Sequence, residues 1–134
     1  MKTVAIFLFL VVGSFAINDE SCYMNLLPDV GNVSNDKLKN CPEAQIFWNY
    51  PDSNLTVLFS APKLKPFKLC LINSNEIKYD ILVYRVVGKQ NSLVVKSNNN
   101  VCMHSDRLTK TVTLKFVGTG KPKYYGVLIE YSIQ

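Results

Sequence analysis

The sequence predicts an all-β fold, an antiparallel β-sandwich held together by two disulfides. Short runs of β-branched and aromatic residues alternate with clusters of Asn, Asp, Ser, Gly and Pro, which is typical of strands separated by turns. No window shows the sustained i, i+3, i+4 apolar stripe of an amphipathic helix. Six to eight strands at this spacing favour a sandwich or a barrel, and the even number of cysteines favours disulfides.

The first sixteen residues have the pattern of a cleavable signal peptide. Lys2 supplies a positive start, an apolar run extends to Val12, and Ser14 and Ala16 place small residues at positions −3 and −1 of a cut after Ala16. The apolar run is about half the ~20 residues that a membrane-spanning helix needs. We therefore expect residues 1–16 to be removed, residues 17–134 to form one extracellular domain, and no transmembrane segment.

The first half of the expected domain starts with a loop-rich stretch that holds two short edge strands. Residues 61–66 contain Pro62 and Pro66, and proline interrupts strand pairing. The strands predicted in this half are residues 24–27, 30–33, 45–50, 55–60 and 67–72.

The second half has the stronger strand patterns. Apolar and polar residues alternate along residues 109–117, which predicts a half-buried strand with Val112, Leu114 and Phe116 inward. Residues 88–91 are predicted as a hairpin loop, and no strand is predicted around Cys102. The remaining strands are predicted at residues 79–87, 92–96 and 124–133, the last with Tyr125, Val127, Ile129 and Tyr131 on one face.

The cysteines favour disulfides over a metal site. They are Cys22, Cys41, Cys70 and Cys102. Zinc sites usually bring their ligands in close pairs, which these spacings lack, and the secretory pathway favours disulfides. Four cysteines allow three pairings, and their spacing alone leaves all three open.

The C-terminal half resembles a CUB domain. The alternating strand through Val112–Phe116, a polar turn and then the run Tyr125–Tyr131 are similar to the closing pattern of that family, and residues 79–84 are similar to its strand after the third cysteine. The resemblance implies a secreted jelly-roll β-sandwich with the pairs Cys22–Cys41 and Cys70–Cys102. The cysteine spacings depart from the family, and Trp48 follows Cys41 by seven positions instead of two, so a divergent member is implied.

Some CUB domains bind calcium through carboxylates. Only Asp80 matches those positions in this chain, and calcium requires six to eight oxygen ligands. We therefore expect no metal and no cofactor, with Asp80 serving as a structural hydrogen-bond acceptor or ion-pair partner.

Two sequons and one lysine cluster are candidate surface features. Asn32 and Asn54 each begin an N-x-S/T motif and are candidate glycosylation sites. The chain carries a net charge of +5, and Lys63, Lys65 and Lys68 form a candidate basic surface. In an extended chain Lys63 and Lys65 would project to one side, with Phe67 beside them. The alternative is a solvated edge on which lysines and prolines prevent aggregation.

No catalytic site is predicted. His104 is the only histidine and lies near Asp106, but no G-x-S-x-G motif is present. The carboxylates are scattered through turns. We expect a non-enzymatic protein with no nucleic-acid partner.

The resemblance also implies a function. Single CUB domains with a signal peptide occur as spermadhesins of seminal fluid and in the venom or saliva of predatory insects, and this lysine- and asparagine-rich chain is more similar to the second group. We expect a binding or effector protein of a gland secretion with a role in defence, whose partner is an extracellular protein, a glycan or an anionic surface.

Three alternatives remain open, one of which is a small hydrolase that would depend on His104. A lipid carrier of the MD-2-related type would have a long apolar cavity, whereas a CUB-like sandwich would be packed solidly between the sheets. An inhibitor or toxin would present an unusually shaped loop at residues 61–67. The residues expected in a solid interior are Leu58, Ile81, Val83, Leu114 and Ile129.

Overall fold

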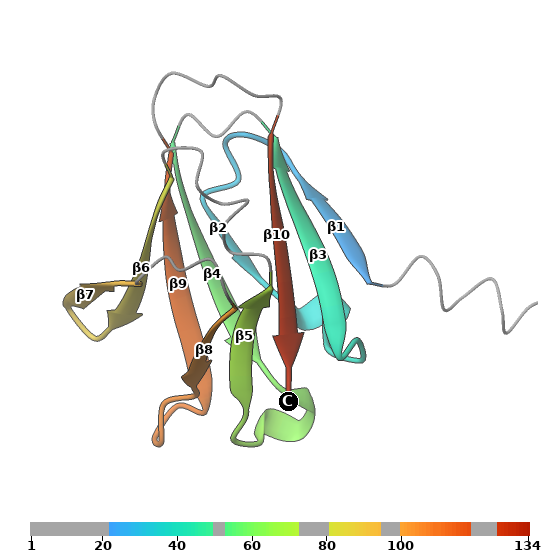
Figure 1. Cartoon of the computed structure of the whole chain (residues 1–134), viewed down its shortest axis with the longest axis vertical. Coiled ribbons are helices and arrows are strands. Elements are labelled where there is room, and N and C mark those ends of the chain that lie inside the picture. Colours follow the sequence, from blue (N-terminus) through green and yellow to red (C-terminus); the bar gives the residue numbers. More distant parts are fainter. Residues whose placement is uncertain (1–21, 50–52, 73–80, 95–99, 119–125) are drawn as a thin grey trace, which may run out of the picture.

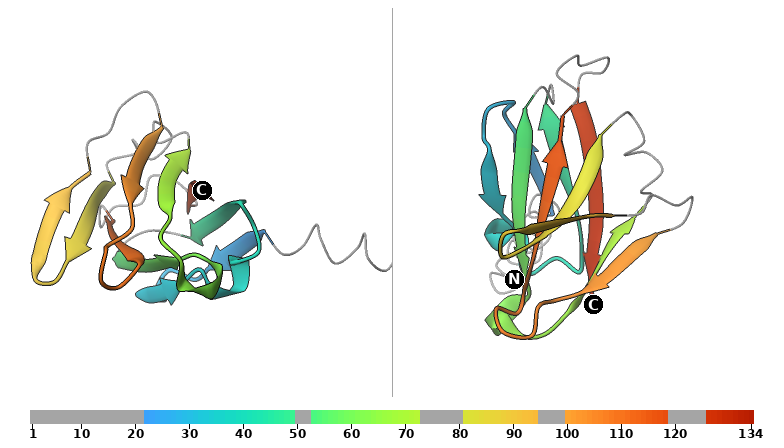
Figure 2. Two further views of the ribbon diagram at one scale, coloured as in Figure 1. Left: turned by 90° about the horizontal axis from the view of Figure 1, so that it is seen from below. Right: turned by 90° about the vertical axis from the view of Figure 1, so that its left-hand side faces the viewer.

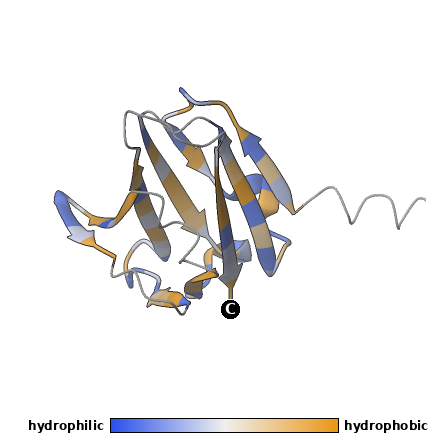
Figure 3. Cartoon of the chain, turned by 45° about the horizontal axis from the view of Figure 1, so that its top comes forward, coloured by the Kyte–Doolittle hydropathy of each residue, from blue (hydrophilic) through white to orange (hydrophobic). Residues whose placement is uncertain are grey.

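Alternation of apolar and polar residues along the strands builds a two-layer structure. The computed structural model describes residues 22–49, 53–72, 81–94, 100–118 and 126–134, so the expected signal peptide lies outside the described residues. Its strands form two facing five-stranded sheets (Figures 1 and 2). Hydrophobic and hydrophilic residues alternate along them (Figure 3), which gives each strand one face toward a shared interior. The predicted all-β sandwich is confirmed.

The two sheets contain ten strands in the described residues, more than the six to eight expected from the spacing and one more than the nine ranges named as strands. Sheet A has the order β1 (Tyr23–Leu26), β3 (Glu43–Asn49), β10 (Gly126–Ile133), β5 (Lys68–Ile72) and β8 (Val101–His104). Sheet B has the order β2 (Asn32–Ser34), β4 (Asn54–Ser60), β9 (Thr111–Val117), β6 (Leu82–Val87) and β7 (Gln90–Leu93). Short 3₁₀ turns are η1 (Asp36–Leu38) and η2 (Pro62–Leu64).

Strand pairing is antiparallel except at one edge of each sheet. There β1 pairs with β3, and β2 with β4, in parallel. The strand β8 was missed by sequence reasoning, and it adds an edge to sheet A beside β5. The hairpin between β6 and β7 turns at Gly88 and Lys89, where Gly88 has φ of +59°. A two-residue turn needs this left-handed backbone, so the returning strand begins earlier than predicted.

The interior is filled by large side chains from both sheets. Trp48, Phe59, Phe116 and Tyr131 are fully buried. The rings of Phe59 and Tyr131 meet edge to face across the two sheets, with centroids 4.8 Å apart. Burial of Val127, Ile129 and Tyr131 confirms the predicted inward face of β10, whereas Tyr125 lies outside the described residues.

Four of the five residues expected in the interior are buried there: Ile81, Val83, Leu114 and Ile129. Leu58 is the exception, with 42% of its surface exposed. Its neighbours Val57 and Phe59 face inward, and successive strand residues point to opposite faces. The inclusion of Leu58 in the interior was therefore wrong.

Asn35 extends the pairing of β2 beyond its end. Its side-chain amide donates to the Ser60 carbonyl (3.0 Å) and accepts from the Ser60 N–H (2.9 Å). Its own N–H donates to the Leu58 carbonyl at 3.1 Å. Asn35 is fully buried, and the three hydrogen bonds satisfy polar groups that would otherwise lose stability on burial.

Tyr131 places a hydroxyl group in the interior without a hydrogen bond to any described residue. Burial raises its pKa from 10.0 to about 12, although the nearby Asn35 amide, already bonded to Ser60, opposes this slightly. The unfolded chain therefore loses this proton at lower pH than the folded chain, and folded-state stability falls as the pH rises from 10 to about 12.

We expect the free energy of unfolding of Tyr131→Phe to fall less steeply than that of the unmodified protein as the pH rises from 10 to about 12. Below pH 10 the two proteins should show the same dependence on pH. Urea unfolding of both proteins across the alkaline range measures it. Parallel curves for the two proteins would show that Tyr131 titrates normally.

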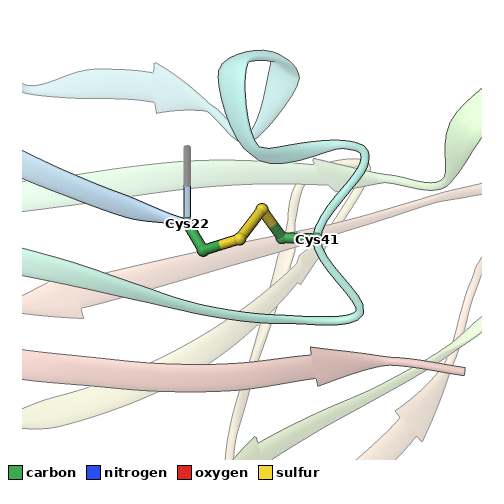
Figure 4. Close-up of a disulfide and its surroundings, with 2 residues drawn as sticks. All are labelled: Cys22 and Cys41. Carbon is green, nitrogen blue, oxygen red and sulfur yellow. A yellow bond between two sulfur atoms is a disulfide. The ribbon is translucent and has the colours of Figure 1, made fainter. Parts of the chain in front are cut away.

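Both disulfides have the pairing that the family resemblance implies. Cys22–Cys41 joins the start of β1 to the segment before β3 (Figure 4), and Cys41 belongs to the interior cluster. Cys70–Cys102 joins directly opposed residues of β5 and β8. Leu69 and Leu71 face inward on either side of Cys70, so this second disulfide lies on the outer side of sheet A, where Cys70 is buried and Cys102 is exposed.

Candidate functional site

Two loops, each connecting one sheet to the other, meet at one end of the sandwich. The first, residues 61–67, links β4 to β5, and the second, residues 105–110, links β8 to β9. The strand ends are register partners, Ser60 with Thr111 and Lys68 with His104. We call this surface, the two loops with the adjoining Lys68, the basal end, which faces the viewer in the left panel of Figure 2.

Hydrogen bonds join the two loops to each other. The N–H of Phe67 donates to the Ser105 hydroxyl (3.0 Å), and the N–H of Ser105 donates to the Phe67 carbonyl (2.9 Å). Phe67 itself is buried among the interior residues. Its predicted place beside a surface lysine cluster was wrong, because the ring holds the loop onto the core instead.

The first loop has an unusual backbone. Lys63 has φ of 59° and Leu64 has φ of 50°, a left-handed conformation that costs energy in residues other than glycine. The N–H of Leu64 donates to the Ala61 carbonyl at 3.1 Å and closes the turn. The chain is therefore not extended here, and the prediction that Lys63 and Lys65 alternate along an extended segment was wrong. The turn leaves Leu64 50% exposed.

The second loop is organised by Asp106. Its carboxylate accepts hydrogen bonds from the N–H groups of Leu108 (2.8 Å) and Thr109 (3.1 Å). These bonds, together with the more distant charge of Arg85, hold the pKa of Asp106 below its usual value. Asp106 therefore has a structural role in the loop. The same loop presents Leu108 with 93% of its surface exposed.

Arg85 links the two sheets beside this loop. It extends from β6 in sheet B, and its guanidinium donates to the His104 carbonyl of β8 in sheet A at 2.6 Å. This contact, like the paired loops, fixes the basal end relative to both sheets.

The basal end is rich in positive charge. The three lysines predicted as a basic surface, Lys63, Lys65 and Lys68, all lie there, and the second loop adds Arg107 and Lys110. Within the described ranges none of these five forms an ion pair, and the Asp106 carboxylate faces backbone N–H groups. Sequence reasoning missed Arg107 and Lys110, because the two segments are joined only by the fold, at Phe67 and Ser105, which are 38 positions apart in the sequence.

Both sequons lie on one face. Asn32 in β2 is the register partner of Thr56 in β4, and Asn54 lies two residues before Thr56 on the same side of the strand. Both asparagines are exposed on the outer face of sheet B. They lie toward the start of β4, and the basal end follows the end of that strand.

We expect both asparagines to carry N-glycans when the chain is made in a secretory cell, because both are exposed. Glycosidase treatment should raise gel mobility in two steps, and Ser34→Ala or Thr56→Ala should each remove one step. Unchanged mobility after glycosidase treatment would refute this prediction.

The described residues form surface hollows, one of which borders the basal end. One, of about 120 Å³, has Arg85, Asp106 and Thr111 among its lining residues. The other, of about 300 Å³, lies against the outer face of sheet A at Tyr23 and Glu130. Both carry charged and polar groups, so neither is the long apolar cavity that a lipid carrier requires.

No group of three or more His, Cys, Asp or Glu side chains that could hold a metal ion occurs within the described ranges, and Asp80 falls outside them. No helix in the described part of the chain has the length and apolarity needed to cross a membrane.

Comparison with known proteins gives likenesses in structure alone. No protein-family model matches the sequence, and no curated protein matches it. The pre-peptidase C-terminal domain of a Bacillus anthracis collagenase is similar over 84% of this chain and 94% of its own, at 8% identity and a TM-score of 0.43. The CUB1-EGF-CUB2 domains of rat MASP-1 are similar over 84% of this chain at 14% identity and a TM-score of 0.40, and the likeness spans 42% of that chain. These likenesses assign the chain to no family.

Proposed function

We propose that the protein is a secreted, non-enzymatic binding protein of divergent CUB type that docks on an anionic extracellular surface through its basal end. The observation that supports this proposal is the convergence of two hydrogen-bonded loops from different strand pairs. It brings five cations, none of which forms an ion pair with another described residue, to one end of the sandwich. Clustered cations attract polyanions and raise association rates.

The proposal extends to the source of the protein. The leader pattern of residues 1–16, the two disulfides and the sequence resemblance to CUB proteins support a product of a gland, such as a venom or saliva, acting in defence. Secretion is tested by mass spectrometry of the protein from culture medium, whose N-terminus should be Ile17.

Binding to immobilised heparin tests the basal end. We expect Lys65→Glu with Arg107→Glu to weaken binding about tenfold or more, because each cation near an anionic surface contributes about 1 kcal/mol. The matched control is Lys89→Glu with Lys115→Glu, which makes the same change in net charge on sheet B and should retain most of the affinity.

Salt gives an independent measure. Between about 0.1 M and about 1 M NaCl the screening length falls from about 10 Å to about 3 Å, and the affinity should fall with it. Equal loss in both double variants would show that net charge matters and the basal end does not. Affinity that is independent of salt would contradict the proposal.

The first loop also favours a second candidate function, an inhibitor or toxin acting on a protein. Its left-handed Lys63 and Leu64 form the unusually shaped, exposed loop that this alternative requires. It predicts one protein target whose binding survives high salt and is lost on substitution of Leu64.

A further inference from the structure

We infer that the anionic surface is a phospholipid bilayer, and that Leu64 and Leu108 insert into it while the flanking cations contact lipid phosphates. The inference rests on the proposed function and names its target. Each loop of the basal end presents one exposed leucine next to cations: Leu64 between Lys63 and Lys65, and Leu108 beside Arg107.

Neither leucine belongs to the interior cluster. Leu108 is 93% exposed and Leu64 50% exposed, although both belong to loops that are tied to the core at Phe67. A single exposed leucine is ordinary on a protein surface. Here two exposed leucines lie on adjoining loops, each beside cations. Proteins that bind at a membrane interface combine the same two elements: apolar side chains that insert, and cations that attract lipid phosphates.

The backbone holds both leucines in their exposed positions. The left-handed conformation at Leu64 is unfavourable for a leucine, and a residue such as asparagine would adopt it more easily. Leu108 is held by the two hydrogen bonds to the Asp106 carboxylate and by the N–H of Lys110, which donates to the Asp106 carbonyl at 2.8 Å. Loops already fixed in the bound shape lose little entropy on insertion.

A bilayer explains more of this surface than an anionic polysaccharide does. A glycosaminoglycan chain offers sulfates and carboxylates to lysines but no apolar region to receive Leu64 or Leu108. The sequon face on sheet B begins at the opposite end of β4, so glycans there would leave the basal end free to approach a membrane.

Vesicle sedimentation tests the inference. The vesicles are phosphatidylcholine alone, and phosphatidylcholine with about 30 mol % phosphatidylserine. We expect the secreted protein to bind only the anionic vesicles, and Leu64→Asn with Leu108→Ser to weaken that binding about tenfold or more. Asparagine tolerates the backbone of residue 64, and Leu108 makes no buried contact, so this variant keeps its fold.

A matched variant and a second ligand separate the possible outcomes. Leu82→Ser with Leu93→Asn alters two exposed leucines on sheet B, creates no new sequon, and should leave vesicle binding unchanged. Heparin binding should be the same in all three proteins. Equal vesicle binding by both leucine variants would overturn the inference while leaving the proposed function intact, whereas loss of heparin and vesicle binding in the unmodified protein would overturn both.

Insertion can also be observed directly. The chain has one tryptophan, the fully buried Trp48, so Leu108→Trp adds a fluorophore at the loop tip. Its emission should shift to the blue on addition of anionic vesicles and should be quenched by brominated lipid. Binding without either change would show contact through charge alone and would contradict insertion.

Discussion

Replacing Phe59 with alanine is expected to lower the free energy of unfolding by about 3–5 kcal/mol, as for other large aromatic residues in well-packed interiors. Phe59 is fully buried in β4 of sheet B and contacts Tyr131 of sheet A edge to face. The substitution removes buried apolar surface and the aromatic contact with Tyr131 that joins the two sheets. An aromatic contact of this kind is worth about 1 kcal/mol. Equilibrium unfolding in urea measures the change.

Phe47 provides the matched control for Phe59. It is the same residue type, lies half-buried on the outer face of β3, and faces away from the interior. We expect Phe47→Ala to cost less than half as much as Phe59→Ala. Equal losses in the two variants would mean that a phenylalanine in the interior stabilises the fold no more than one on the outer face of sheet A.

Removal of the Cys22–Cys41 disulfide is expected to have the second large effect. Cys22→Ala with Cys41→Ala frees a loop with a sequence separation of 19, and loop-closure entropy alone gives a loss of about 3 kcal/mol. Cys41 is also part of the interior cluster, so packing is lost as well. We therefore expect a total loss of about 4 kcal/mol in urea unfolding.

The second disulfide serves as the comparison. Cys70→Ala with Cys102→Ala frees a longer loop, with a separation of 32, so loop entropy alone predicts a slightly larger loss. This crosslink joins β5 to β8, which lies at the edge of sheet A among the described strands. We expect the smaller loss here, because neither Cys70 nor Cys102 belongs to the interior cluster of which Cys41 is a part. A larger loss for this pair would show that loop length outweighs burial.

Local patterns predicted the strands that alternate clearly. The apolar–polar alternation of β9 gave its buried face correctly, residue by residue, and the same holds for the described part of β10. The strand β8 has only four residues at a sheet edge, too few to show a period beside its polar neighbours. The disulfide pairing followed from the family resemblance, because four cysteines alone allow three arrangements.

The basal end could be predicted only in part. Lys63, Lys65 and Lys68 were identified because they are close in sequence. The left-handed backbone at Lys63 and Leu64 contradicts the preference of both residues, and such local conflicts are invisible in a pattern and tend to mark functional sites. The addition of Arg107 and Leu108 depends on the Phe67–Ser105 hydrogen bonds, a tertiary contact that sequence spacing does not reveal.

The position of β10 has a consequence for how the chain matures. It is the last strand in the sequence, yet it lies in the middle of sheet A between β3 and β5. Ribosomal synthesis delivers residues 126–133 after all four cysteines, the last of which is Cys102. Both crosslinks can thus form while the centre of the sheet is still missing, and arrival of β10 then completes a scaffold that is already covalently tied.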